Sequence, residues 1–368
     1  MKLQKVLPVY DESNAHTLEV VTSKGNFVTP NQIVNGNELN AMIKEGVSFG
    51  DFDQIQIRSK FDKKRIMQMK NDGGALHRTI TDWGTRCSAF KYKSCIPVLE
   101  GTKELSDEDL SFLRSMQMDA GMDVIYFPSE RVSSPRFAAK LDKFREDAAR
   151  LAPELDVIPV LDLRDSHSIF KSKFNHLMDA GYPAVCLWYV GIVESRSKLF
   201  YIQSVARKLD MWTMLSNYAP QYSRQTPAST THILPWYGLD SYAKATNDFP
   251  SYLLEEGTDV LPPRDPTTVR FFGKATLGIL DQDTFRKDKE SLSGCPCEGI
   301  HGSTMNDVLS NGGEAAARLS KIHTLFAGEA ILEEMRTKIQ ERELEKFLKS
   351  KKYPNQAIVF GSLDDLLL

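Results

Sequence analysis

The sequence predicts an α/β protein in which a (β/α)8 barrel forms most of the chain. From residue 77 onwards, apolar runs of β type alternate with amphipathic helical segments, which is typical of a parallel sheet with helical crossovers. The length of 368 residues and the number of these runs fit a closed barrel better than an open sheet. No Gly-x-Gly-x-x-Gly motif follows the first strand, which argues against a dinucleotide-binding domain.

The first part of the chain predicts a β-hairpin, a short helix and a strand. Residues 17–29 alternate apolar and polar side chains about a Lys-Gly-Asn turn, which is the pattern of an N-terminal hairpin. A helix is expected over Glu38–Glu45 and a strand over Gln54–Ile57. Residues 58–70 are rich in lysine and arginine. Such a run is usually a solvated face, and binding of phosphate groups is the alternative.

The alternating elements of the barrel follow. The predicted strands are Thr79–Thr81, Asp123–Phe127, Val157–Leu161, Ala184–Tyr189, Trp212–Ser216, His232–Leu234 and Thr268–Phe272, and the predicted helices are Asp107–Ala120, Arg136–Leu151, His167–Ala180 and Leu199–Leu209. Because catalytic residues of such barrels lie where the strands end, we expect acidic residues at those ends to form the site.

The pattern changes near residue 290, and this change divides the chain. We expect a barrel with the N-terminal hairpin over residues 1–290, a helical zinc-binding subdomain inserted over residues 291–353, and a segment over residues 354–368 that returns to the barrel. Within the subdomain, residues 314–345 have the spacing of one long, charged helix with an apolar face.

The pair Cys295 and Cys297, with His323 further along, predicts a metal site. Zn²⁺ takes four sulfur or nitrogen ligands in a tetrahedron, and His301 is the candidate for the fourth position. The alternative is two buried free thiols beside an ordinary helix. The sequence therefore predicts one structural Zn²⁺ ion.

Composition sets outer limits on the function. The chain is 41% hydrophobic and 26% charged, which is typical of a globular protein, and no apolar run is long enough to span a membrane. Five cysteines, mostly scattered, argue against a disulfide framework and for a cytoplasmic protein. We expect the cell to be bacterial, archaeal or a phage-infected host. The net charge of −3 provides no overall attraction to nucleic acid, so any such binding depends on a local patch.

Several short motifs resemble those of the tRNA-guanine transglycosylase superfamily, and most closely its DNA-modifying branch. They are the Cys-x-Cys pair with its distant histidine, the segment Thr79–Gly84, the segment Tyr237–Lys244 and the opening Val28-Thr29-Pro30. The resemblance implies an enzyme of the glycosyltransferase class, a DNA-guanine transglycosylase that exchanges guanine in DNA for a 7-deazaguanine base such as 7-cyano-7-deazaguanine. It implies Asp240 as the nucleophile of a covalent intermediate and Asp82 as the general acid/base. Each aspartate alone is equally a turn residue or a helix cap.

The same resemblance implies a base pocket. Its candidate residues are Trp83, Ser129, Glu130, Asp162, Trp188 and Gly191. The implied partners are DNA, whose target nucleotide must leave the stack, and the incoming 7-deazaguanine base, with no membrane partner and a homodimer left open.

Three alternatives to the DNA enzyme stay open at this point. The first is a tRNA-guanine transglycosylase, and the second is a non-catalytic, nucleic-acid-binding partner subunit of such an enzyme. The third is an unrelated barrel hydrolase that acts on small glycosides.

Overall fold

The computed structural model describes most of the chain. The described residues are 2–5, 15–22, 25–48, 52–99, 104–189, 192–206, 211–218, 235–236, 238–244, 269–292, 295, 302–311 and 313–351.

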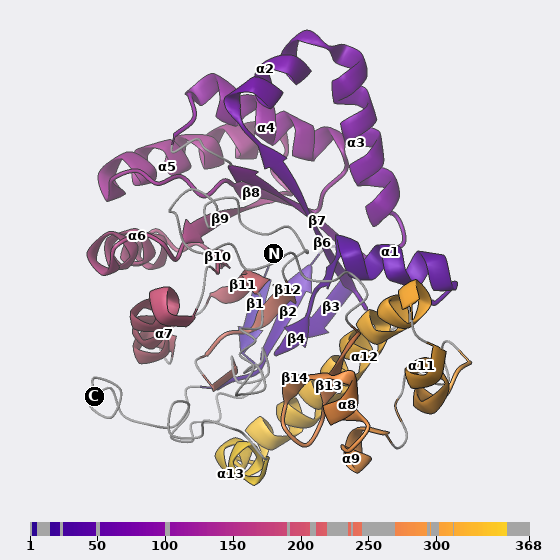
Figure 1. Cartoon of the computed structure of the whole chain (residues 1–368). Coiled ribbons are helices and arrows are strands. Elements are labelled where there is room, and N and C mark those ends of the chain that lie inside the picture. The colour runs from indigo at the N-terminus through magenta and orange to yellow at the C-terminus, as the bar shows by residue number, and fades with distance from the viewer. Residues whose placement is uncertain are drawn as a thin grey trace, which may run out of the picture.

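A ring of parallel strands forms the centre of the molecule (Figure 1). In the described residues the first position of the ring is shared by two short segments, β4 and β5. The strands are β4 (Asn31–Gln32), β5 (Val34–Asn35), β6 (Gln54–Phe61), β7 (Tyr92–Leu99), β8 (Val124–Phe127), β9 (Asp156–Asp162), β10 (Ala184–Trp188), β11 (Trp212–Tyr218) and β12 (Ser241–Lys244).

Strand pairing follows the chain order and then returns to its start. β5 pairs with β6 and β6 with β7, and a second run of parallel pairs extends from β8 to β12. The backbone N–H of Asp123 donates to the carbonyl oxygen of Lys93 at 2.9 Å and joins β7 to β8. Ser241 of β12 lies opposite Asn31 of β4, which closes the ring. The predicted α/β fold with a parallel, TIM-barrel-like arrangement is therefore confirmed.

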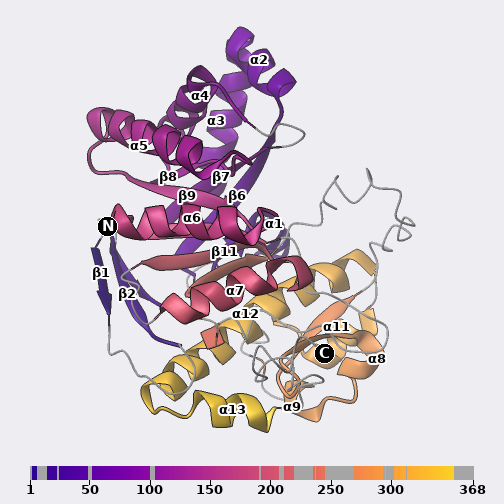
Figure 2. The same cartoon turned by 90° about the vertical axis from the view of Figure 1, so that its left-hand side faces the viewer.

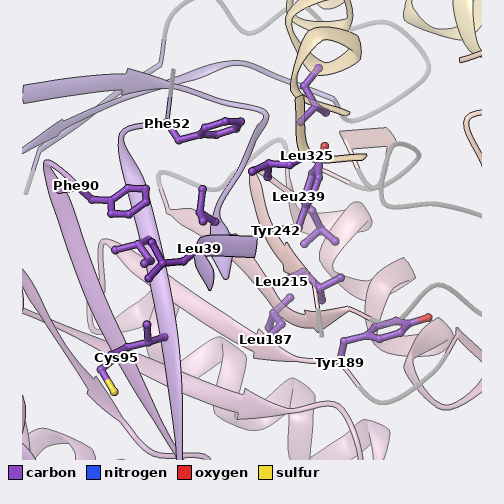
Figure 3. Close-up of a cluster of buried hydrophobic side chains, with 14 of the residues drawn as sticks. Leu39, Phe52, Phe90, Cys95, Leu187, Tyr189, Leu215, Leu239, Tyr242 and Leu325 are labelled. Carbon is purple, nitrogen blue, oxygen red and sulfur yellow. The ribbon is translucent and has the colours of Figure 1, made fainter. Parts of the chain in front are cut away.

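Helices cover the outside of the ring (Figures 1 and 2). They are α1 (Gly36–Glu45), α2 (Lys63–Asn71), α3 (Gly73–Cys87), α4 (Asp107–Asp119), α5 (Ser134–Leu151), α6 (His167–Asp179) and α7 (Ile192–Ala206). Buried apolar side chains of the helices and of the outward-facing strand positions form a continuous layer, part of which is drawn in Figure 3. Among the described residues, no helix has the length and apolar character that a membrane crossing requires.

Helix α1 shows how local sequence sets the start and end of an element. The Asn35 side chain accepts from the backbone N–H groups of Asn37 and Glu38, and the Glu38 carboxylate accepts from Asn35 N–H. This reciprocal pair satisfies N–H groups that have no partner in the first helical turn. Gly46 ends the helix at a φ of 65°, a conformation that glycine adopts at little cost.

An antiparallel sheet lies across the amino-terminal mouth of the barrel. It contains β1 (Lys2–Lys5), β2 (Leu18–Thr22) and β3 (Gly25–Val28), with Thr22 opposite Gly25 at the turn. The ring of Phe27 contacts Tyr92 and Trp212, at centroid distances of 5.8 and 5.2 Å. Tyr92 and Trp212 are the first residues of β7 and β11, so Phe27 closes the barrel interior from the amino-terminal side.

The C-terminal elements pack beside α1 and the start of the barrel. They are β13 (Arg270–Gly273), β14 (Gly278–Asp281), α8 (Gln282–Phe285), α9 (Lys289–Leu292), α11 (Met305–Asn311), α12 (Gly313–Gln340) and α13 (Leu344–Ser350). Phe326 of α12 packs edge-on against Phe52 at 5.0 Å. The carboxylate of Glu329 accepts from the backbone N–H of Gln32 at 2.9 Å. Helix α12 therefore provides the acceptor for a backbone N–H group of β4 that is not bonded to a described strand.

Most predicted barrel elements are confirmed, and two are wrong. The strands predicted over residues 123–216 correspond to β8–β11, and the helices to α4–α7, with α7 beginning earlier, at Ile192. The strand predicted over Thr79–Thr81 is wrong, because these β-branched residues lie inside α3, whose start is set by the Asp72 cap. The strand predicted at Thr268–Phe272 is not part of the barrel, because β13 pairs antiparallel with β14.

The barrel strands β7 and β12 were not predicted. Pro97 within β7 lowers the strand signal, because proline lacks a backbone donor. The predicted strand His232–Leu234 lies outside the described residues, and β12 takes the last position of the ring.

Candidate anion-binding site

The carboxyl ends of the strands bring polar side chains together around Arg58 of β6. The Arg58 guanidinium donates to Asn217 Oδ1 at 3.3 Å and to the carbonyl oxygens of Ala243 and Lys244 at 3.2 and 2.5 Å. Its Cζ lies 5.5 Å from the centre of the Trp188 ring. One side chain therefore connects β6 with the ends of β10, β11 and β12.

Asn217 is shaped by an irregularity at the end of β11. Its φ is 64°, in the left-handed region that asparagine tolerates better than most residues, and the register between β11 and β12 shifts over residues 215–218. Its side-chain amide donates to the carbonyl oxygen of Tyr189 at 3.0 Å. The irregularity thus places the Asn217 side chain where it both accepts from Arg58 and contacts β10.

A cationic pocket of about 410 Å³ lies beside the carboxyl half of β6. Residues 57–60 of β6 form one wall, and residues of α2 and α3 form the others. Five of the lining side chains are basic and one is acidic: Arg58, Lys60, Arg65, Arg78, Arg86 and Asp82. The pocket thus concentrates positive charge in a chain whose net charge is −3.

Little carboxylate charge offsets these cations among the described residues. Asp82 lies 3.5 Å from the Arg86 guanidinium, and its side chain is 58% exposed. Arg65 donates to the backbone carbonyl oxygen of Lys60 at 2.6 Å and not to an acid. Arg78 is exposed and forms no ion pair with a described residue. An anion in the pocket would therefore find the guanidinium groups of Arg65 and Arg78, which are not engaged by carboxylates of the described residues.

A buried lysine–glutamate pair lies next to Arg58. Lys244 Nζ is 3.6 Å from Glu38 Oε1, and their side chains are 13% and 5% exposed. Burial lowers the pKa of Lys244 below its ordinary value, although Glu38 acts in the opposite direction. Burial also raises the pKa of Glu38, against the effects of Lys244, of the Asn35 backbone and of Arg58.

Two residues predicted for the base pocket do meet at the carboxyl ends. Asp162 ends β9 and Trp188 ends β10, and they are direct neighbours in the strand register. The Asp162 carboxylate is buried and is held by the Arg164 guanidinium through three contacts, at 3.0, 2.9 and 2.5 Å. Asp162 is therefore already paired, whereas the half-buried ring of Trp188 lies against Arg58.

The other predicted pocket residues have different surroundings. Glu130 is buried and accepts from the backbone N–H of Leu105 at 2.7 Å and from Lys140 at 3.2 Å, so it organises the loop after β8. The Ser129 hydroxyl is buried and has no hydrogen bond with a described residue. Trp83 is 4% exposed and packs edge-on against Phe61, so most of its ring belongs to the core. Gly191 lies outside the described residues.

The structure does not bring the two predicted catalytic aspartates together. Asp240 precedes β12, and its Oδ2 accepts from Thr213 N–H and Thr213 Oγ1 at 2.8 and 2.7 Å, near the amino end of β11. Asp82 lies within α3 and lines the pocket beside the carboxyl half of β6. Asp82 is thus exposed on a covering helix and Asp240 is buried beside β11, so the two carboxylates do not form one site in this structure.

Asp240 is also enclosed by the amino-terminal segment. Its Oδ1 accepts from Thr29 Oγ1 at 3.3 Å and lies 3.0 Å from Nε2 of His16, and the side chain is 1% exposed. These contacts connect β12 and β11 to the segments that flank β2 and β3. We infer that Asp240 anchors the structure at the amino-terminal mouth.

Of the four predicted zinc ligands, the structure describes two, and these two are in contact. Cys295 Sγ lies 3.0 Å from His323 Nδ1, and His323 Nε2 lies 3.1 Å from the carbonyl oxygen of Phe272. Both side chains are buried, and the rings of Phe271 and Phe285 flank the imidazole. Cys297 and His301 lie outside the described residues, and no group of three or more metal-ligating residues occurs within them.

Sequence reasoning missed most of the cationic pocket. The basic run over residues 58–70 was the available signal, and it contributes Arg58, Lys60 and Arg65. Arg78 and Arg86 were not identified, because the segment that carries them was interpreted as a strand followed by a loop. Lys244 was noted only as part of a motif, and Glu38 only as a helix boundary.

Comparison with known proteins finds similarity in the solved structures alone. No protein-family model matches the chain, and no curated protein matches it. One similar structure is 2,3-dimethylmalate lyase, a PEP mutase/isocitrate lyase superfamily member, with 12% identity over 61% of this chain and 77% of that chain and a TM-score of 0.38. The YdjI aldolase from Escherichia coli K12 has 7% identity over 83% and 94%, with a TM-score of 0.39. Oxaloacetate acetylhydrolase has 12% identity over 63% and 86%, with a TM-score of 0.39. At these values the similarities do not indicate a reaction.

The expected membership of the tRNA-guanine transglycosylase superfamily is wrong. Base exchange needs Asp82 and Asp240 at one site, whereas Asp82 is exposed on α3 and Asp240 is buried beside the amino end of β11. The similar solved structures named above are a lyase, an aldolase and an acetylhydrolase. The expectations of DNA modification and of 7-deazaguanine exchange are overturned with the family, as are the tRNA enzyme and the partner subunit. The homodimer stays a prediction.

Proposed function

We propose that this protein is an enzyme that binds a phosphorylated small molecule at the carboxyl ends of its barrel strands. The observation that carries this proposal is the cationic pocket beside β6, with five basic side chains and one carboxylate. Phosphate groups are recognised by arginine forks of this kind. The volume of about 410 Å³ suits a small ligand, since such sites generally measure about 300–1,000 Å³.

The position of the pocket supports an enzymatic role. In TIM-barrel enzymes the active site lies at the carboxyl ends of the strands, where loop and strand residues converge. Arg58 belongs both to the pocket and to the polar cluster formed with Trp188, Asn217 and Lys244. A phosphate in the pocket would therefore hold the rest of the substrate close to groups that are capable of acid–base chemistry.

Calorimetric titration with inorganic phosphate and pyrophosphate tests the proposal. We expect pyrophosphate to bind more tightly than phosphate, and both affinities to fall as salt is added. In Arg78→Gln we expect a loss of about 1 kcal/mol, or roughly fivefold in Kd, because Arg78 is exposed and its contact is screened. Arg342→Gln is the matched control, since Arg342 is also exposed and follows α12, outside the pocket. Equal affinity of the two variants, or no binding to wild type, would reject the pocket as a phosphate site.

We also propose that Cys295 and His323 contribute to a structural Zn²⁺ site. Their contact supports this. The Phe272 carbonyl oxygen accepts from His323 Nε2–H, so Nδ1 carries no proton, and its lone pair, which could bind a metal ion, faces the Cys295 thiol. A bound zinc ion would replace the thiol proton and connect the chain at Cys295 with α12. Metal analysis of purified wild type and His323→Ala tests this, with the half-buried His176→Ala as the control. Equal zinc content in all three proteins would reject the site.

A further inference from the structure

Lys244 has the surroundings of a reactive amine. It is the last residue of β12, at the end of the barrel where the cationic pocket lies. Its Nζ is buried and has no hydrogen bond within 3.5 Å among the described residues, and its nearest charged partner is Glu38 Oε1 at 3.6 Å. The side chain as a whole is 13% exposed, so it is not sealed within the core.

Glu38 is placed to exchange protons with this amine. Its Oε2 accepts from the backbone N–H of Asn35 at 3.0 Å, which fixes the carboxyl group at the start of α1. Its other oxygen, Oε1, faces Lys244 Nζ. The helix cap thus orients a carboxyl group towards a buried lysine.

Burial favours the neutral form of both groups. It lowers the pKa of Lys244 and raises the pKa of Glu38, while their mutual attraction and the nearby Arg58 act in the opposite direction. A neutral amine beside a protonated carboxyl group is the combination that imine formation needs, since the amine attacks and the acid donates a proton.

The pair lies directly beside the cationic pocket. Arg58 lines the pocket and donates to the Lys244 carbonyl oxygen at 2.5 Å. Arg86, which also lines the pocket, extends to the start of α1. If Gly36 carried a Cβ atom, that atom would lie 3.1 Å from Arg86 Nη2, and Gly36 is two residues before Glu38. An anionic group bound by these arginines therefore places the adjoining atoms of the same molecule near Lys244.

We propose that Lys244 forms an imine with the carbonyl carbon of a phosphorylated aldehyde or ketone, with Glu38 as its proton donor and acceptor. This inference rests on the proposed phosphate-binding function and specifies its substrate class. The neutral Nζ attacks the carbonyl carbon, and Glu38 protonates the carbonyl oxygen, which gives a carbinolamine. Glu38 then takes a proton from nitrogen and returns it to the departing hydroxyl group. One water leaves and one C=N bond forms, without an oxidant or reductant.

Reductive trapping tests the inference with pyridoxal 5′-phosphate as a phosphorylated aldehyde probe. The protein is incubated with the probe and sodium cyanoborohydride, and labelled lysines are identified by peptide mass spectrometry. We expect Lys244 to be labelled at lower probe concentration than the exposed Lys63 and Lys64 of α2. Pyridoxal, which lacks the phosphate, should label Lys244 about tenfold less, since it loses the charge-assisted contacts of the pocket.

Two variants separate a chemical role from a structural one. Glu38→Gln should bind phosphate as wild type does but label Lys244 more slowly, because it has lost the proton donor. The double variant Lys244→Met/Glu38→Gln leaves no unpaired buried charge and should bind phosphate without being labelled at position 244. Labelling confined to surface lysines, or equal labelling of Lys244 in wild type and Glu38→Gln, would overturn the inference.

Phosphate titration distinguishes this failure from failure of the proposed function. If phosphate binds and Lys244 is not trapped, the pair is an ion pair that holds β12 to α1, and the phosphate site stands. If phosphate does not bind, both proposals fail.

Discussion

Asp240 allows the anchoring interpretation to be tested directly against the catalytic one. In Asp240→Asn the side chain keeps its shape and one oxygen. The negative charge is lost, and an NH2 group replaces an oxygen that accepted hydrogen bonds in wild type. In wild type Oδ2 accepts two hydrogen bonds from Thr213, and Oδ1 accepts one from Thr29 and lies near His16. Hydrogen bonds to a buried charged acceptor are worth about 1.5–3 kcal/mol each. Loss of two or more of them predicts a decrease of about 3–5 kcal/mol in the free energy of unfolding.

Asp82→Asn is the matched control because it makes the same chemical change on an exposed helix. Among the residues that the structure describes, Asp82 has a single ion contact, at 3.5 Å, and its side chain is 58% exposed. We expect its free energy of unfolding to change by less than about 0.5 kcal/mol. Urea unfolding followed by tryptophan fluorescence and far-UV circular dichroism measures both variants, and phosphate titration without urea measures the pocket.

The expected result is a destabilised Asp240→Asn that still binds phosphate. Its anchoring contacts lie at the amino ends of β11 and β12, whereas the pocket lies beside the carboxyl half of β6. If Asp240→Asn unfolds within about 1 kcal/mol of wild type, the hydrogen bonds do not have the anchoring role that we infer. If it is stable but no longer binds ligand, Asp240 belongs to a functional site after all.

Three further predictions concern the barrel mouth, the thiols and the metal. Phe27→Ala should lower the free energy of unfolding by about 3–5 kcal/mol in urea titrations, because it opens a cavity under the barrel interior. Burial raises the pKa values of Cys87 and Cys186 to about 12, so both should resist iodoacetamide in the folded protein from pH 7 to pH 9 and react after unfolding. Alkylation of either in the native state would contradict their burial. Chelation of zinc should expose Cys295 to alkylation, and an unchanged rate would contradict a shared site with His323.

The elements with a clear period were predicted well because their local signals agree with the fold. Helices α4, α5 and α6 have capping serines or an early proline and an apolar face, so propensity and packing select the same structure. The buried strands β8–β11 have continuous apolar runs between these helices, which is typical of a parallel sheet covered on both faces.

The segment around Asp82 shows where local reasoning fails. Thr79, Ile80 and Thr81 have β-type side chains, and a short strand was the natural prediction. The structure makes them helical because the Asp72 cap starts α3, and the buried Trp83 and Cys87 then face the core at helical spacing. The same error moved the proposed acid to a strand end and supported the wrong family.

By itself, the sequence determined the α/β class, the order of most barrel elements and a run of basic residues after residue 57. These depend on periodicity, caps and composition, which are local properties. Only the tertiary structure decided that Asp82 and Asp240 lie apart, that arginines of α3 join Arg58 of β6 in one pocket, and that Glu38 faces Lys244. Such contacts join residues up to about two hundred positions apart, and ring closure, which no local pattern encodes, brings them together.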